Sequence, residues 1–167
     1  MRLLAAVLVP VLVLALSACG FQLRGVASLP FETLYIPNAN AGIALDLKRY
    51  IQGGTRTVVV DNPKSAQAQL ELSGEQRLRN ILSLSGAGRV RELQLVFRVN
   101  LRVHDGKGGE FLPLTPFSIT RDLTYSDTDV LSKEAEEANI YREVQADLVQ
   151  QILRRLSAAQ PAKPAVQ

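Results

Sequence analysis

Apolar and polar side chains alternate along one stretch of the chain, RELQLVFRVNLRV at residues 91–103, and the fold class follows from it. From residue 93 onward its odd positions are apolar and carry Leu93, Leu95, Phe97, Val99, Leu101 and Val103. Polar residues lie between them: Glu92, Gln94, Arg98, Asn100 and Arg102. A period of two places successive side chains on opposite faces of a β-strand. The stretch therefore predicts a strand with one face in the core and the other toward water.

The segments on either side have the same period. Apolar residues occupy even positions in 66–84, namely Ala66, Ala68, Leu70, Leu72, Leu78, Leu82 and Leu84, and odd positions in 117–125, namely Phe117, Ile119, Leu123 and Tyr125. The glycine-rich links SGAG (85–88) and HDGKGGE (104–110) are typical of turns. We therefore expect an antiparallel meander of three strands. Pro113 and Pro116 place the start of the third strand at a sheet edge or outside the hydrogen-bonded ladder.

Apolar residues recur at the spacing of an α-helix both before and after this meander. Ile43, Leu47, Tyr50 and Ile51 form one stripe, with Asn38 or Asn40 as the expected cap and Gly53-Gly54 as the end. A second stripe contains Leu131, Ala135, Ala138, Tyr141, Val144 or Gln145, Leu148, Ile152 and Leu156. Acidic residues favour the early turns of this last helix and Arg154 and Arg155 favour its end, as the helix dipole requires.

Two shorter segments complete the predicted order. FETLYIP (31–37) is rich in β-formers and ends at a proline, which predicts a first strand, whereas TRTVVVDNP (55–63) fits either a short strand or an extended link. The order is β-α-β-β-β-α. It predicts an α+β fold, a two-layer sandwich with two helices packed on one face of a mostly antiparallel (mixed) sheet of about four strands.

The N-terminus is typical of a lipoprotein signal peptide. A basic start is followed by an apolar run from Leu3 to Leu16. This run is too short for a membrane-spanning helix, which takes roughly 20 residues. Leu16-Ser17-Ala18-Cys19 then resembles the bacterial lipobox. We expect cleavage after residue 18 and a covalent lipid on Cys19, an S-diacylglyceryl group with an N-acyl chain. A transmembrane anchor or buried helix remains the alternative for residues 1–18, and an unpaired thiol or intermolecular disulfide the alternative for Cys19.

These signals divide the chain into parts. Residues 1–18 are the predicted signal peptide, 19–30 the lipidated N-terminus and tether, 31–157 a single α+β domain, and 158–167 a disordered tail. Gly20 follows the cysteine in place of the aspartate that often marks inner-membrane retention, so the predicted location is the outer membrane. Acyl chains anchor a protein stably when about two or more are present.

The composition argues against an enzyme, a metal protein and a nucleic-acid binder. The chain has one cysteine and one histidine, His104, which lies beside Asp105 in a predicted surface turn. It therefore offers neither a nucleophile–base pair nor a His/Cys metal cluster. SGAGRVRE (85–92) resembles a phosphate loop only faintly, because a strand and not a helix follows it. The net charge of +3 and the lack of tryptophan do not indicate nucleic-acid binding. No cofactor is expected.

Three stretches together resemble the LptE family of lipopolysaccharide-assembly lipoproteins. They are CGFQLRG (19–25), LSGAGRVRELQL (84–95), and LSKEAEE (131–137) leading to QQILRRL (150–156). The resemblance implies an outer-membrane lipoprotein that plugs the LptD β-barrel, assists its assembly and binds lipopolysaccharide. It also implies a sheet with two helices. The alternative is a lipoprotein scaffold or pilotin for another envelope complex, with no lipid binding.

The resemblance also implies a lipopolysaccharide site. In the family, basic residues in the loop before the strand at 91–103 and at the start of the last helix are tied to lipopolysaccharide binding. Lys133 falls on the helix position, while the loop position aligns near Gly86 and is followed by Arg89 and Arg91. Guanidinium groups suit the phosphates of lipid A. The alternatives are solvated strand-end charges at Arg89 and Arg91, and a surface pair of Lys133 with Glu137.

Overall fold

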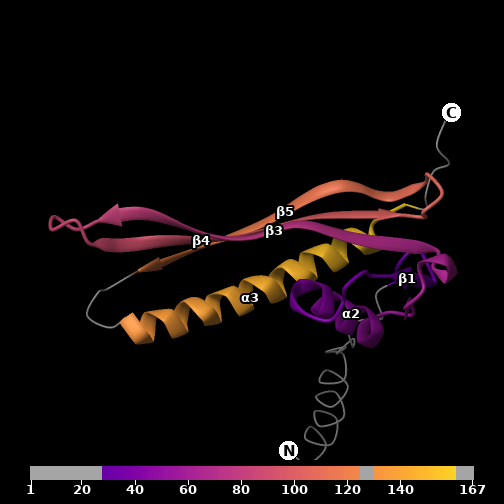
Figure 1. Cartoon of the computed structure of the whole chain (residues 1–167), viewed down its shortest axis with the longest axis horizontal. Helices are drawn as coiled ribbons and strands as arrows, with labels where there is room; N and C mark the ends of the chain where they lie inside the picture. The colour runs from indigo at the N-terminus through magenta and orange to yellow at the C-terminus, as the bar shows by residue number, and fades with distance from the viewer. Residues whose placement is uncertain (1–27, 125–129, 161–167) are drawn as a thin grey trace, which may run out of the picture.

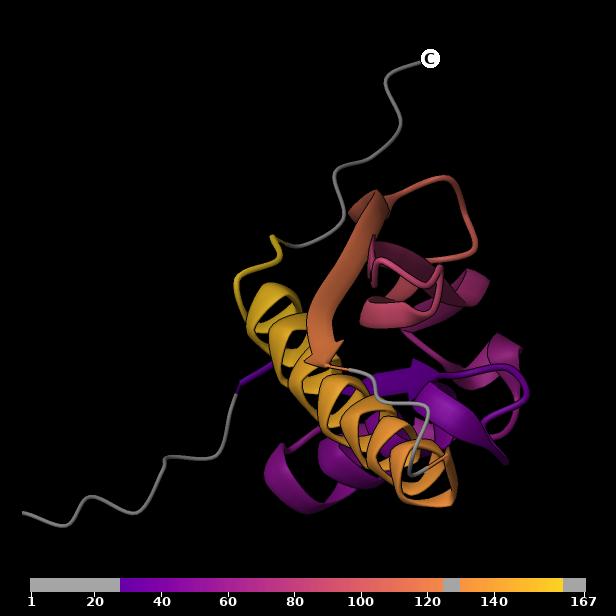
Figure 2. The same cartoon turned by 90° about the vertical axis from the view of Figure 1, so that its left-hand side faces the viewer.

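A five-stranded mixed sheet carries two helices on one face in the computed structural model, which describes residues 28–124 and 130–160 (Figure 1). The elements are β1 (Thr33–Tyr35), α2 (Gly42–Gly54), β2 (Val58–Val60), a 3₁₀ turn (Pro63–Ser65), β3 (Ala68–Leu84), β4 (Val90–His104), β5 (Glu110–Thr124) and α3 (Val130–Ser157). The view from one end shows both helices on the same side of the long strands (Figure 2). The predicted two-layer α+β fold is confirmed. The predicted signal peptide, Cys19 and residues 161–167 lie outside the described residues.

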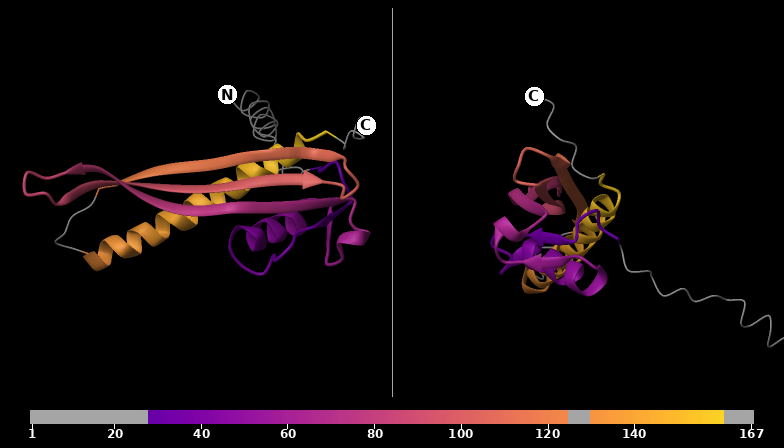
Figure 3. Two further views of the ribbon diagram at one scale, coloured as in Figure 1. Left: turned by 45° about the horizontal axis from the view of Figure 1, so that its top comes forward. Right: turned by 90° about the vertical axis from the view of Figure 1, so that its right-hand side faces the viewer.

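The strand order is β2-β1-β3-β4-β5. The sheet has five strands instead of about four, because Val58–Val60 pairs in parallel with β1 and is a strand, not a link. β1 also pairs in parallel with the start of β3, where Leu34 faces Ala68. The predicted meander of β3, β4 and β5 is antiparallel, and these strands lie side by side in Figure 3. Pro113 and Pro116 lie in β5, which is an edge strand, where missing N–H groups are tolerated.

The core lies between the helices and one face of β4. All the odd apolar residues of β4 from Leu93 to Val103 are buried, as the alternation predicts. Most of them join a main cluster with both helices, whereas Leu93, Leu95 and Leu123 of β5 form a smaller one beneath the first half of α3. The burial of these side chains is the main contribution to folding.

β3 does not keep one apolar face, and here the prediction from alternation is wrong. Leu70 and Leu72 face the helices, but a β-bulge between Ser73 and Gln76 adds one residue to the strand. Gly74 in this bulge has a φ of 63°. Glycine adopts this conformation without strain. Because a one-residue shift exchanges the faces of a strand, Leu78, which was expected inward, no longer shares the face of Leu70 and Leu72. Two further register shifts follow between Ile81 and Leu84, and Leu82 and Leu84, also expected inward, are exposed there.

Both helices bury one stripe. In α2, Ile43, Leu47 and Ile51 are buried, whereas Tyr50 is exposed. The helix ends at Gly54 as predicted, but its N-cap is Ala41, not Asn38 or Asn40, and no side chain caps it. In α3 the fully buried residues begin at Val144 and continue through Leu148, Val149, Ile152 and Leu156. Earlier positions of the predicted stripe, including Ala138, leave space between this helix and β3.

The hairpin of β3 and β4 projects beyond both helices (Figures 1 and 3). Near its tip the apolar side chains of Ile81, Leu82 and Leu84 are exposed. Two ion pairs join the sheet to α3 behind the tip. Arg121 of β5 lies 2.8 Å from Asp147, and Arg79 of β3 lies 3.3 Å from Glu137. These two pairs hold α3 to both outer strands of the meander.

Candidate functional site

The predicted cations lie at the hairpin end of the molecule. Arg89 leaves the SGAG turn, where its backbone N–H donates to the Ser85 hydroxyl and its carbonyl accepts from the Ser85 N–H. Arg91 follows in β4 and is exposed. β5 ends beside the start of β4, with Thr124 opposite Glu92, so the chain enters α3 at this same end. The structure thus brings Lys133 to the same end as both arginines, and their role in binding stays a prediction.

Lys133 has a different partner from the one expected. Its Nζ lies 2.7 Å from Glu136 Oε2, an i+3 contact, and its side chain is only 20% exposed. Glu137, the alternative predicted partner, pairs with Arg79 instead. The charge of Lys133 is therefore paired within α3, with Glu136. Glu137 instead joins α3 to β3 through Arg79.

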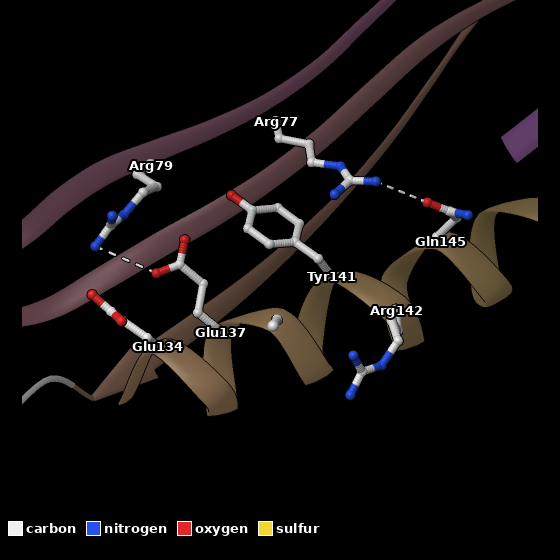
Figure 4. A pocket seen from close by; sticks show the side chains of 8 residues that line it. Arg77, Arg79, Glu134, Glu137, Tyr141, Arg142 and Gln145 are labelled. Carbon is white, nitrogen blue, oxygen red and sulfur yellow. Dashed lines mark hydrogen bonds and ion pairs between the residues drawn. The ribbon is translucent and has the colours of Figure 1, made fainter. Parts of the chain in front are cut away.

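A pocket of about 430 Å³ lies beside this end, between β3 and the first half of α3 (Figure 4). β3 contributes Arg77 and Arg79, which the bulge turns toward the helix, since Arg77 pairs with Phe97 and Arg79 with Leu95 on the inner face of β4. α3 contributes Glu134, Glu137, Ala138, Tyr141, Arg142 and Gln145. A β-bulge that re-aims side chains is common next to functional sites.

Arg77 is held in place from three sides. Its guanidinium carbon lies 5.4 Å from the ring centroid of Phe97 and 5.5 Å from that of Tyr141. Both distances are within the range of cation–π attraction. One terminal nitrogen donates to Gln145 Oε1 at 3.0 Å, and Gln145 Nε2 donates to Asp46 of α2 at 2.7 Å. Among the described residues, Arg77 forms no ion pair with a carboxylate.

The other walls of the pocket are also ordered by specific contacts. Desolvation by burial, together with the nearby Glu137 carboxylate, raises the pKa of Tyr141. The phenol is therefore protonated at neutral pH, and it donates to the Leu78 carbonyl at 3.2 Å. Arg142 is the outermost of the lining residues, and it donates to the side chain of Asn139. Its guanidinium points away from Arg77 and Arg79 (Figure 4). The pocket thus combines the guanidinium of Arg77, the ion pair of Arg79 with Glu137, and the carboxylate of Glu134.

Sequence reasoning missed this pocket because it assigned Arg77 and Arg79 to the solvent face. Strict alternation through 66–84 places odd positions outward, and only the bulge reverses them. One signal was present, since an isolated glycine inside a strand pattern suggests a bulge. Gly74 is that residue.

The described residues show how potential metal ligands are grouped and what surrounds His104. They contain no group of three or more His, Cys, Asp or Glu side chains placed to hold a metal ion. His104 is not the solvated turn residue expected, because its side chain is only 15% exposed and its Nε2 lies 3.2 Å from Glu71. Its Nδ1 accepts from the Gly106 N–H, so the ring braces the turn. Within residues 28–124 and 130–160, neither helix combines the length and the apolar composition needed to cross a membrane.

Comparisons with known proteins agree on one family. The LptE family, described as Lipopolysaccharide-assembly, matches residues 31–156. The LPS-assembly lipoprotein LptE of Yersinia pestis (strain Pestoides F) is 26% identical over 155 residues, which span 90% of this chain and 74% of that protein.

Solved structures extend this agreement to three dimensions. An uncharacterized lipoprotein B from Nitrosomonas europaea, solved by NMR, has a TM-score of 0.71 and 43% identity and covers 83% of this chain and 91% of its own. A minor lipoprotein from Acinetobacter baumannii has a TM-score of 0.64 at 22% identity, over 81% of this chain and 99% of its own, and supports the fold alone. Since the family match spans nearly all of the α+β domain, the chain belongs to the LptE family of lipopolysaccharide-assembly lipoproteins, and its role lies in lipopolysaccharide assembly.

Proposed function

We propose that the protein is a lipid-anchored outer-membrane lipoprotein that plugs an LptD-like β-barrel, assists its assembly and binds lipopolysaccharide on its way to the surface. The observation that carries this proposal is the family match over residues 31–156. In this proposal the protein is an accessory binding protein, not an enzyme. Its anchor is the acylated Cys19.

The outer face of the sheet suits a barrel lumen. The lumen of a large barrel is polar. The helix-free face of β4 carries five polar residues, Glu92, Gln94, Arg98, Asn100 and Arg102, around the buried Val96, and hydrogen bonds link it to its neighbours. Gln94 accepts from Asn80 of β3 at 3.5 Å and donates to Asp122 of β5 at 3.3 Å. We propose that this face lies against the lumen wall.

Co-purification tests the barrel partner. The full chain is extracted from membranes in detergent, and the proteins that remain bound are identified by mass spectrometry. An LptD-like barrel in stoichiometric amount supports the proposal. Recovery of a different envelope complex without the barrel would favour the scaffold or pilotin alternative.

The anchor has its own expected result. Mass spectrometry of the mature protein should find Cys19 as the first residue, carrying a diacylglyceryl group and an N-acyl chain. Each buried methylene of these chains contributes about 0.8 kcal/mol to membrane binding. An unmodified thiol at Cys19, or a chain that still begins at Met1, would contradict the lipoprotein anchor.

Charge reversal tests the role of the hairpin end. Replacing Arg89, Arg91 and Lys133 with glutamate is expected to weaken binding to purified lipopolysaccharide by roughly tenfold or more, because attraction to the phosphates becomes repulsion. Binding should also weaken as salt screens these charges. Folding should be preserved, since exposed charge pairs contribute under about 1 kcal/mol.

A matched control distinguishes an effect of where the charges lie from an effect of the overall net charge. The triple change Arg49→Glu, Arg56→Glu and Lys64→Glu alters the net charge equally, but these exposed residues lie on or near α2, away from the hairpin. It should leave binding nearly unchanged. Circular dichroism confirms that each variant is folded. Equal loss of affinity in both triple variants would show that only the overall charge matters.

A further inference from the structure

The pocket between β3 and α3 contains the guanidinium of Arg77, which is held in place by its neighbours and keeps unused N–H donors. An arginine side chain has five N–H donors. The hydrogen bond of Arg77 to Gln145 uses one of them. Its planar group is fixed between the rings of Phe97 and Tyr141, so little side-chain freedom is lost when an anion binds. A pre-organised guanidinium without a carboxylate partner is suited to bind a phosphate or carboxylate group.

The other charges of the pocket narrow the choice of ligand. Arg79 and Glu137 largely neutralise each other at 3.3 Å. Glu134 remains as a carboxylate that repels a bare anion but accepts hydrogen bonds from hydroxyl groups. The guanidinium of Arg142 points away from Arg77 (Figure 4). A ligand that carries both an anionic group and hydroxyl or amide donors satisfies both Arg77 and Glu134.

The charged groups of the lining disfavour an acyl chain. Six of the eight lining residues are charged or carry a side-chain amide, while their aliphatic stems, Ala138 and the ring of Tyr141 supply apolar surface between these groups. Burying such groups against a hydrocarbon chain would leave them without hydrogen bonds, which is costly. The pocket volume of about 430 Å³ is in the ordinary range for a small-molecule site.

We propose that this pocket binds a phosphorylated sugar, with Arg77 as the phosphate ligand and Glu134 accepting from sugar hydroxyls. The same chemistry occurs in the headgroup of a phosphorylated glycolipid and in a free sugar phosphate. If the phosphosugar is the headgroup of lipopolysaccharide, this inference rests on the proposed function. If it is a free sugar phosphate, the inference does not. The bulge at Gly74 creates the site, because it turns Arg77 toward α3.

The experiment uses the full mature chain in detergent micelles. N-acetylglucosamine 1-phosphate is titrated and followed by ligand-observed NMR, with N-acetylglucosamine and inorganic phosphate as comparison probes. The phosphorylated sugar is expected to bind saturably and more tightly than either probe. Absence of saturable binding, or equal binding of inorganic phosphate, would overturn the proposal.

Variants assign the binding to the pocket. Arg77→Gln is expected to weaken binding of the sugar phosphate about tenfold, because charge-assisted hydrogen bonds are lost. Arg77→Lys keeps the charge and the aliphatic stem but loses the planar fork, so an intermediate loss is expected. Arg155→Gln is the matched control, since Arg155 is an exposed arginine in the last turn of α3, at the opposite end of the helix from the pocket. Equal affinity in folded Arg77→Gln and wild-type protein would refute the site.

A second arm separates the two sources of the ligand. Binding of purified lipopolysaccharide is measured for wild type, Arg77→Gln and the Arg89, Arg91 and Lys133 triple variant. Weaker binding in Arg77→Gln supports the lipid headgroup as occupant. If Arg77→Gln loses sugar-phosphate binding but binds lipopolysaccharide as wild type does, the headgroup is not the occupant of the pocket. The occupant is then a free sugar phosphate. If wild type binds no lipopolysaccharide at all, the proposed function fails, while the sugar-phosphate titration still decides the pocket.

Discussion

Replacing Phe97 with alanine is expected to lower the free energy of unfolding by about 3–5 kcal/mol. The Phe97 side chain is 1% exposed and belongs to the main core cluster, on β4 between two neighbouring strands. Truncation removes the apolar surface of the ring from the core and leaves a cavity that the surrounding side chains fill only in part. Domains are typically stable by about 5–15 kcal/mol, so this loss is a large share of the total.

Urea unfolding followed by circular dichroism measures this effect. Leu114→Ala is the matched control, because Leu114 is 62% exposed on the edge strand β5. Its truncation should change stability by no more than about 0.5 kcal/mol. Phe97→Leu adds a second comparison, since it keeps most of the core volume and removes the ring on which Arg77 stacks. Equal unfolding midpoints for Phe97→Ala and Leu114→Ala would contradict the burial of Phe97.

The second large effect is expected at the bulge, where Gly74→Val should cost about 3 kcal/mol of stability. A side chain at positive φ costs about 1–3 kcal/mol, and a β-branched residue is at the upper end of that range. Gly74 has a φ of 63°, and a Cβ there would lie 2.9 Å from the Asn100 amide nitrogen. If β3 relieves this strain by a one-residue shift, Arg77 and Arg79 turn away from α3. Either response should impair the pocket.

Gly86→Val provides the matched control for this prediction. Gly86 lies in the turn between β3 and β4, and a Cβ there meets no atom within 4 Å. Its replacement should leave the urea midpoint nearly unchanged. Binding of N-acetylglucosamine 1-phosphate should fall in Gly74→Val and persist in Gly86→Val. A Gly74→Val protein with wild-type stability and binding would show that the bulge does not require glycine and does not form the pocket.

Local patterns in the sequence specified the meander, the helical layer and the family. The period of two in 91–103 and its neighbours, with glycine turns between them, specified an antiparallel meander, because alternation and short turns are local properties of the chain. The two helical stripes specified the layer that covers it. Pro113 and Pro116 predicted that the start of the third strand lies at an edge or outside the ladder, and the structure has β5 at the edge. The resemblance in three separate stretches also identified the family.

Only the tertiary structure decided the parallel pairing of β2 with β1 and the face on which Arg77 and Arg79 lie. Parallel pairing joins segments that an intervening helix separates, and no local pattern encodes it. In β3, the hydrogen bonds to β4 determine which side chains face α3, and one extra residue at Gly74 reverses the alternation. Local alternation cannot locate that residue, because the register depends on a partner strand elsewhere in the chain. The pocket therefore exists only because the paired strands differ by one residue in length between Ser73 and Gln76.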